Sequence, residues 1–197
     1  MTIRRGTVTD AAVAARLHAS TITEGFLPRL GPQFLSRLYR CIARDPQSFL
    51  LIAEAADGTT AGMIVGTQDV QALYRRFLRR DGVIAAAVAL PRVLRHARSV
   101  LETWRYGRSE SDDLPAAELL AVAVADDARG QGLGRELVAA LNAEFGGRDA
   151  TAVKVVVGAD NAAALHVYRS CGYREVSSIE VHQRVESKVL VWSPSPH

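Results

Sequence analysis

The sequence predicts an α/β domain, and three observations support this fold class. From residue 117 onward, apolar runs and helical stretches follow one another in the order strand, helix, strand, helix, strand, a pattern typical of α/β proteins. The length of 197 residues suits one well-packed domain. With 48% hydrophobic and 23% charged residues, the composition is that of an ordinary globular protein.

The N-terminal segment predicts a strand, a helix and a loop. TIRR (2–5) is expected to be a short strand, and Thr9 or Asp10 can cap a helix that runs to about Ser20. The following stretch, TITEGFLPRLG, contains Pro28 and a glycine, which predict a loop or a broken helix.

The next segment predicts a second helix and a hairpin. Apolar residues recur at helical spacing in PQFLSRLYRCIAR (32–44), and Asp45-Pro46 ends the pattern. SFLLIAEA and TAGMIVGTQ are expected to be two strands joined by a turn at Asp57-Gly58.

Residues 70–108 differ from the rest of the chain in charge. Nine arginines fall there against two acidic residues, Asp81 and Glu102, and such clustering creates a local positive field. An apolar stripe at helical spacing predicts that the segment is mainly helical and packs on the domain. The stripe consists of Val70, Leu73, Tyr74, Phe77 and Leu78.

The C-terminal half predicts alternating elements. AELLAVAV is expected to be a strand, followed by a helix from Gly132 to about Phe145, and then by the strand AVKVVVG. A second helix is expected from about Asn161 to Ser170, and residues 173–192 predict two final strands.

Three glycines fall within five positions between the first of these strands and its helix. In ADDARGQGLGREL, residues Gly130, Gly132 and Gly134 allow a sharp turn and a close approach of the backbone to another group. Backbone N–H groups at the start of a helix suit an anion, above all a phosphate. Arg135 stands where the triphosphate loop needs Lys and where the dinucleotide fingerprint needs its third glycine. Neither common nucleotide loop fits.

Several other kinds of site are not expected. Cys41 and Cys171 lie far apart without a C-x-x-C motif, which disfavours a disulfide scaffold or structural zinc and favours a reducing compartment. His18, His166 and His182 are not spaced as metal ligands. The start of the chain lacks the apolar region of a signal peptide, and the longest apolar run, VIAAAVAL, is too short for a membrane span. We expect a cytoplasmic protein that needs no metal.

Two segments resemble the acyl-CoA motifs of the GCN5-related N-acetyltransferases, the GNAT superfamily. RGQGLG (129–134) matches the family signature Arg/Gln-x-x-Gly-x-Gly/Ala. NAAALHVYRSCGYRE resembles the family's following segment, in which Asn161 is followed by Tyr168 and then by Gly172-Tyr173.

The resemblance covers residues 116–192 closely and 1–69 loosely. It implies the GNAT fold, with a mixed central sheet of six to seven strands flanked by helices. Residues 70–115 would then be a helical, arginine-rich insertion between the third and fourth strands of a single domain, residues 1–197.

The resemblance also implies acetyl-CoA as the acyl donor. The glycine loop would wrap the pyrophosphate of CoA, and the strand before it would present backbone groups to the pantetheine arm. Asn161 resembles the residue that bonds the pantetheine, but Asn is equally suited to cap a helix, so both roles stay open. The implied donor-binding residues are Val122, Ala123, Val124, Arg129, Gly130, Gln131, Gly132, Leu133, Gly134, Arg135, Asn161 and Tyr168.

The resemblance gives Tyr168 the role of the general acid that protonates the leaving thiolate. The base stays open between Glu118, Glu24 and water. Glu118 is the one ionisable residue in its strand, and strict alternation would put it on the same face as Leu120, Val122 and Val124. Glu24 lies in a loop where related proteins often form the acceptor pocket, and it is a candidate for substrate binding.

We therefore expect an enzyme that moves the acetyl group of acetyl-CoA to a primary amine of a small molecule by direct attack in a ternary complex. Backbone N–H groups of the strand 118–124 would polarise the thioester. The arginine-rich insertion favours an acidic or nucleotide-linked amino sugar as acceptor, although it could equally be a solvated face or a homodimer contact. The alternative is a CoA-binding module without catalysis, whose basic helices dock on nucleic acid or an anionic membrane. No nucleic-acid-binding motif accompanies those helices.

Overall fold

Seven strands form one mixed sheet in the computed structural model, which describes residues 1–22, 27–81, 114–181 and 185–194. The strand order is β1-β2-β3-β4-β5-β7-β6, and only β4 and β5 run parallel to each other. The prediction of a mixed sheet with six to seven strands is confirmed. The strands are β1 (Thr2–Arg5), β2 (Ser48–Glu54), β3 (Thr60–Thr67), β4 (Glu118–Val124), β5 (Val153–Gly158), β6 (Arg174–Val181) and β7 (Val185–Trp192).

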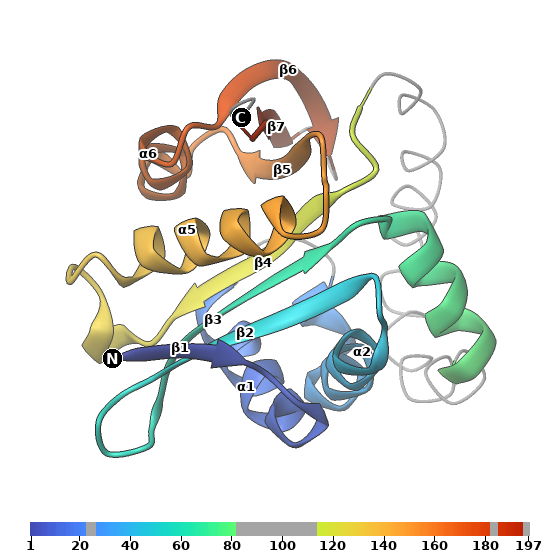
Figure 1. Cartoon of the computed structure of the whole chain (residues 1–197), viewed down its shortest axis with the longest axis vertical. Helices are drawn as coiled ribbons and strands as arrows, with labels where there is room; N and C mark the ends of the chain where they lie inside the picture. The colour runs from blue at the N-terminus through green and yellow to red at the C-terminus, as the bar shows by residue number, and fades with distance from the viewer. Residues whose placement is uncertain (23–26, 82–113, 182–184, 195–197) are drawn as a thin grey trace.

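Helices cover both faces of the sheet (Figure 1). α1 (Ala11–Thr21) and α2 (Pro32–Arg44) pack on one face of β2, β3 and β4, and α5 (Leu133–Gly146) packs on the other face, next to α6 (Ala162–Ser170). The described helices include none that is long and apolar enough to cross a membrane. Short 3₁₀ turns complete the fold: η1 (Val8–Asp10), η2 (Leu27–Leu30) and η3 (Asp126–Ala128).

Residues 70–81 form a further helix after β3, drawn in green in Figure 1. Asp69 caps it, because its Oδ1 accepts a hydrogen bond from the N–H of Ala72 at 2.8 Å. The predicted apolar stripe is only half buried: Leu73 and Phe77 lie in the core beside α1 and α2, whereas Tyr74 and Leu78 are 37% and 50% exposed. The remaining part of the predicted helical insertion lies outside the described residues.

An ion pair to a buried carboxylate holds helix 70–81 against the domain. Arg76 Nη2 lies 2.9 Å from Asp45 Oδ2, and the Asp45 side chain is only 2% exposed. Asp45 also accepts a hydrogen bond from the Ser48 hydroxyl, which in turn lies 2.9 Å from the Thr67 hydroxyl. The pair therefore ties this helix to the end of α2 and to the first residue of β2.

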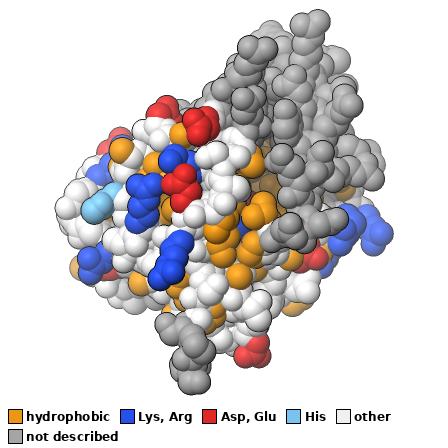
Figure 2. Space-filling view, turned by 90° about the horizontal axis from the view of Figure 1, so that it is seen from above, with side chains coloured by type: hydrophobic (Ala, Val, Ile, Leu, Met, Phe, Trp, Pro, Cys, Tyr) orange, Lys and Arg blue, Asp and Glu red, His pale blue; other side chains and the backbone are white. Residues whose placement is uncertain are grey.

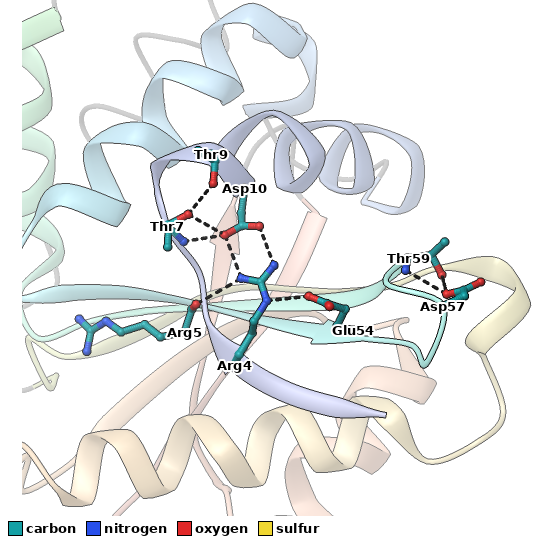
Figure 3. Close-up of polar contacts among 8 residues, drawn as sticks. All are labelled: Arg4, Arg5, Thr7, Thr9, Asp10, Glu54, Asp57 and Thr59. Carbon is teal, nitrogen blue, oxygen red and sulfur yellow. Dashed lines mark hydrogen bonds and ion pairs between the residues drawn. The ribbon is translucent and has the colours of Figure 1, made fainter.

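A second polar network fixes the N-terminal strand (Figure 3). Arg4 donates to both carboxylate oxygens of Asp10, at 2.9 and 3.0 Å, and to Glu54 at 2.7 Å. Asp10 occupies the N-cap position of α1, as predicted, but its carboxylate accepts bonds from Arg4 and Thr7 rather than from the first turn of α1. Together these bonds tie β1, η1 and β2.

Candidate active site

The glycine loop has the left-handed backbone that only glycine adopts easily. Gly130 and Gly132 have φ angles of 76° and 83°, and a Cβ at either position would meet no atom within 4 Å. Glycine is therefore required here by the backbone conformation, and no side chain of the described chain fills the space. Gly132 is the N-cap residue of α5, so the open space lies at the start of that helix.

Free donors surround this open space. Within the described part of the chain, the backbone N–H groups of residues 130–134 have no hydrogen-bond acceptor. They stand at the positive end of the dipole of α5. Left-handed glycines, free N–H groups and a helix start fit a diphosphate, as the sequence predicted.

Two arginines flank the loop, and among the described residues one of them forms an ion pair and the other does not. Arg129 forms an ion pair with Asp126 at 3.0 Å, and its Nε donates to the carbonyl of Val124 at 3.4 Å. Gln131 donates to the carbonyl of Asp127 at 3.1 Å. The exposed Arg135, in the first turn of α5, forms no ion pair with any described residue, so its guanidinium is available to an anionic ligand.

The two parallel strands separate after a short contact. β4 and β5 pair only at Glu118 with Lys154 and at Leu119 with Val155. From Ala121 to Val124, β4 pairs with β3 alone among the described strands. We call the opening beyond these two pairs the split.

A bulge in β4 directs backbone groups toward the split. Val65 pairs with Ala121 and Gly66 with Leu119, so Leu120 is the extra residue. The N–H of Ala125 donates to the carbonyl of Ala61, and backbone directions alternate along an antiparallel pair. The main-chain groups of Ala123 therefore point to β3, while those of Val122 and Val124 point into the split.

The same bulge overturns the predicted face of Glu118. Leu119 packs in the core on the α5 side, whereas Ala121 and Ala123 pack in the core on the α1 side. Because Glu118 points away from the face of Leu119, it lies on the α1 side. The expectation that Glu118 shares a face with Leu120 agrees with this, because Leu120 also packs on the α1 side. The expectation that the face includes Val122 and Val124, which pack on the α5 side, was wrong, since the alternation is broken at Leu120.

Glu118 is a carboxyl group with few partners. Its side chain is 17% exposed, and its Oε2 lies 3.7 Å from Lys154 Nζ. Burial raises the pKa of Glu118, while Lys154 acts in the opposite direction. Burial and the nearby Glu118 also raise the pKa of Tyr74, on helix 70–81, to about 12. A carboxylate with a raised pKa is a suitable proton acceptor near neutral pH.

Tyr168 and Tyr173 are adjacent but differ in their hydroxyl groups. Their rings lie 5.7 Å apart on the α5 side of the sheet. The hydroxyl of Tyr173 donates to Asn142 at 3.0 Å, whereas that of Tyr168 has no partner among the described residues. Burial raises the pKa of Tyr168, so it is a phenol at neutral pH and has a proton to donate.

Asn161 caps α6. Its Oδ1 accepts a hydrogen bond from the N–H of Ala164 at 3.1 Å, which confirms the helix-capping alternative. Its side-chain NH₂ donates to no described residue and stays available for a ligand. The two roles proposed for Asn161 are thus compatible.

The other predicted site residues fall into two groups. Glu24 and His182 lie outside the described residues. His18 is a core residue, bonded through Nδ1 to the Tyr39 hydroxyl at 2.8 Å, and burial lowers its pKa to about 4. Among the described side chains, no group of three or more His, Cys, Asp or Glu is placed to hold a metal ion.

Sequence reasoning did not single out Lys154 or the bulge at Leu120. Lys154 had a signal: it is the one charged residue in the run AVKVVVG, which was expected to be a buried strand, in a chain whose other basic residues are almost all arginine. The bulge had none, because the run ELLAVAV is apolar after its first residue and contains no glycine that would mark an irregularity.

Comparisons with known proteins point to one family. The family model described as "Acetyltransferase (GNAT) family" matches residues 17–173, and a search of curated proteins found no match. The chain is similar in fold to the ribosomal-protein-S18-alanine N-acetyltransferase from Escherichia coli, at 16% identity and TM-score 0.64, over 100% of this chain and 95% of that one. It is also similar to the ribosomal-protein-alanine N-acetyltransferase from Brucella melitensis, at 18% identity and TM-score 0.66, over 98% and 100% of the two chains.

A third similar structure has a different acceptor in its name. It is a variant of the spermidine N-acetyltransferase SpeG from Vibrio cholerae, at 17% identity and TM-score 0.62, over 98% of this chain and 95% of that one. The split, the glycine loop and the family match over most of the chain lead to one conclusion: this chain belongs to the acetyltransferase (GNAT) family and is an acetyltransferase enzyme.

Proposed function

We propose that this enzyme transfers the acetyl group of acetyl-CoA to the primary amine of a small molecule that carries negative charge. The observation that supports the proposal is the split, with free backbone donors at one end and a carboxyl and a phenol on opposite faces of the sheet. An acyl donor in the split would be reachable from both faces.

The donor would be held mainly by backbone groups. The N–H groups of residues 130–134 would bind the diphosphate of CoA, with Arg135 as a charged partner. Val122 and Val124 would pair with the amide groups of the pantetheine arm as an added strand does, and Asn161 would donate through its free NH₂. The backbone groups of Ala123 would not bind the donor, since they point to β3; Ala123 would serve only as part of the strand.

Proton transfers on the two faces would complete the reaction. Glu118 would take a proton from the acceptor ammonium and pass it to solvent. The neutral amine would form the C–N bond with the thioester carbon as the C–S bond breaks. Tyr168 would give its proton to the leaving sulfur and recover one from the nitrogen of the product amide. Glu24 and water remain the other candidates for the base.

The acceptor class follows from helix 70–81. The N–H of Val70 donates to the carbonyl of Ala116, so this helix begins beside the segment that leads into Glu118, and its outer surface bears the exposed arginines Arg75, Arg79 and Arg80. Such a surface attracts anions and repels polycations, so an acidic or nucleotide-linked amino sugar is preferred to spermidine. On the α6 face seen in Figure 2, basic and acidic side chains are mixed, and Arg169 and Lys188 both pair with Glu175. That face therefore offers no purely basic surface to nucleic acid.

The test is an assay of CoA thiol release from acetyl-CoA with a panel of amines. The panel contains a nucleotide-linked amino sugar, an acidic amino acid, spermidine and a peptide with N-terminal alanine, and mass spectrometry identifies the acetylated product. We expect turnover with an anionic amine and a KM for it that rises about tenfold in Arg79→Ala/Arg80→Ala. Arg40→Ala, at an exposed position on α2, is the matched control.

Two outcomes would contradict the proposal. Tight binding of acetyl-CoA with no thiol release for any amine would favour the CoA-binding module without catalysis. Turnover with spermidine or the peptide, unaffected by the two arginine substitutions, would exclude the anionic acceptor.

A further inference from the structure

Lys154 closes the inner end of the split. It is the register partner of Glu118, in the first of the two pairs between β4 and β5. Its backbone N–H donates to the carbonyl of Ala117 at 2.9 Å, and its Nζ donates to the carbonyl of Pro115 at 2.6 Å. One residue of β5 thus holds the segment that leads into β4 by two hydrogen bonds.

The ammonium group of Lys154 has a fixed place that does not depend on Glu118. The side chain is only 11% exposed, and the bond to Pro115 holds Nζ at the closed end of the split. Nζ lies 3.7 Å from Glu118 Oε2, which is longer than a hydrogen bond. Lys154 therefore acts on the carboxylate through its charge and leaves the carboxylate oxygens free to accept a proton.

Few other charged groups face this carboxyl. Among the described residues, helix 70–81 contributes Tyr74, which is uncharged at neutral pH, and β3 places Thr67 opposite Glu118. Lys154 is the cation on β5. Burial favours the neutral carboxylic acid, and the positive charge of Lys154 counteracts that preference.

We infer that Lys154 is a positioning residue that places its charge beside Glu118 and so keeps this carboxyl ionised at the closed end of the split. The inference rests on the proposed role of Glu118 as the base. A carboxyl that was already protonated could not take a proton from the acceptor. The ammonium group of Lys154, 3.7 Å from Glu118 Oε2, supplies the charge that favours the ionised form.

The direct test is the titration of Glu118 followed by NMR in protein with ¹³C-labelled Glu carboxyl groups. The signal is assigned from its loss in Glu118→Gln. In Lys154→Met we expect the midpoint to move upward by about one to three pH units, the range for losing an opposite charge at this distance. Lys154→Arg keeps the charge and should keep the midpoint within about half a pH unit of the wild type.

Control variants separate this effect from general damage. The only other lysine, Lys188, pairs with Glu175 on the exposed edge, so Lys188→Met is the matched control and should not move the Glu118 midpoint. If Lys154→Met does not fold, Lys154→Gln removes the charge but retains an N–H donor for Pro115. An unmoved midpoint in a folded variant without the charge overturns the inference.

The activity profile then distinguishes the inference from the function on which it rests. In the Lys154 variants without the charge, the acidic limb of the pH profile of kcat/KM for the acceptor should move upward with the titration, while the KM for acetyl-CoA stays constant. If Glu118→Gln retains wild-type turnover, the proposed base is wrong. If Glu118→Gln is inactive and the limb does not move, Glu118 stands and the role of Lys154 fails.

Discussion

Replacing Gly132 with valine should abolish tight donor binding without unfolding the domain. Gly132 has φ +83°, and a Cβ there meets no atom of the described chain within 4 Å. The substitution therefore creates no internal clash. Its effect on the fold is limited to backbone strain, about 2 kcal/mol for a branched residue in the left-handed region.

The effect on binding should be larger than this strain. A branched side chain would occupy the space in front of the free N–H groups of residues 130–134. Loss of two hydrogen bonds to a charged diphosphate, at about 1.5 kcal/mol or more each, amounts to about 3 kcal/mol. Since each 1.4 kcal/mol is a factor of ten, the Kd for acetyl-CoA should rise about a hundredfold.

Gly58 provides a control with the same backbone conformation. It lies in the turn between β2 and β3 and has φ +84°, and a Cβ there would likewise meet no atom within 4 Å. Gly58→Val should therefore lose as much stability as Gly132→Val and keep the wild-type affinity for acetyl-CoA. Isothermal calorimetry and thermal unfolding of both variants measure the two quantities. Equal affinity of a folded Gly132→Val and the wild type would refute the assignment of the loop.

The remaining predictions concern the proposed general acid Tyr168, its neighbour Tyr173 and the N-terminal residue Asp10. Tyr168→Phe should lower kcat by about a hundredfold, the low end for a lost general acid, while the KM for acetyl-CoA stays nearly constant. Tyr173→Phe should instead lower stability, because it loses the hydrogen bond to Asn142. Wild-type turnover of Tyr168→Phe would mean that Tyr168 has only a structural role. Arg4 lowers the pKa of Asp10 from 3.8 to about 2, so Asp10 stabilises the fold above about pH 4, and this contribution is lost as the pH falls through 2. Asp10→Asn should lower the free energy of unfolding by about 1 kcal/mol at pH 7. The loss is no larger because Arg4 is 41% exposed and solvent weakens the ion pair. Equal stability of Asp10→Asn and the wild type in urea at pH 7 would contradict this prediction.

The glycine loop of the proposed donor site could be predicted as a structural feature because it depends on a short stretch of backbone. Glycines before a helix permit the left-handed conformation that Gly130 and Gly132 adopt. Tyr168 and Asn161 could be placed because α6 begins and ends close to the positions that the sequence predicts. In each case the sequence pattern and the structural feature that it predicts lie within about ten residues of each other.

The other side of the site depends on contacts between distant segments. Tyr74 looked like part of an apolar stripe, but helix 70–81 buries Leu73 and Phe77 and leaves Tyr74 beside Glu118. The face of Glu118 depends on a bulge that arises from pairing with β3. Neither could be derived from local periodicity, because each is set by a partner far away in the sequence.

The split itself explains why its closed end must be held firmly. From Leu120 to Val124, β4 loses its hydrogen bonds to β5, and the main-chain groups of Val122 and Val124 have no strand partner on that side in the described chain. Unpaired backbone groups are unfavourable when removed from water, so the opening must stay accessible to solvent or to a ligand. Only two residue pairs join β4 to β5, and the bonds from Lys154 to Ala117 and Pro115 add to them, while the hydrophobic core beneath α5 includes residues of both halves of the sheet. Lys154 therefore has a structural part besides its proposed effect on Glu118, and for this reason the test of its role uses the titration of Glu118 rather than stability.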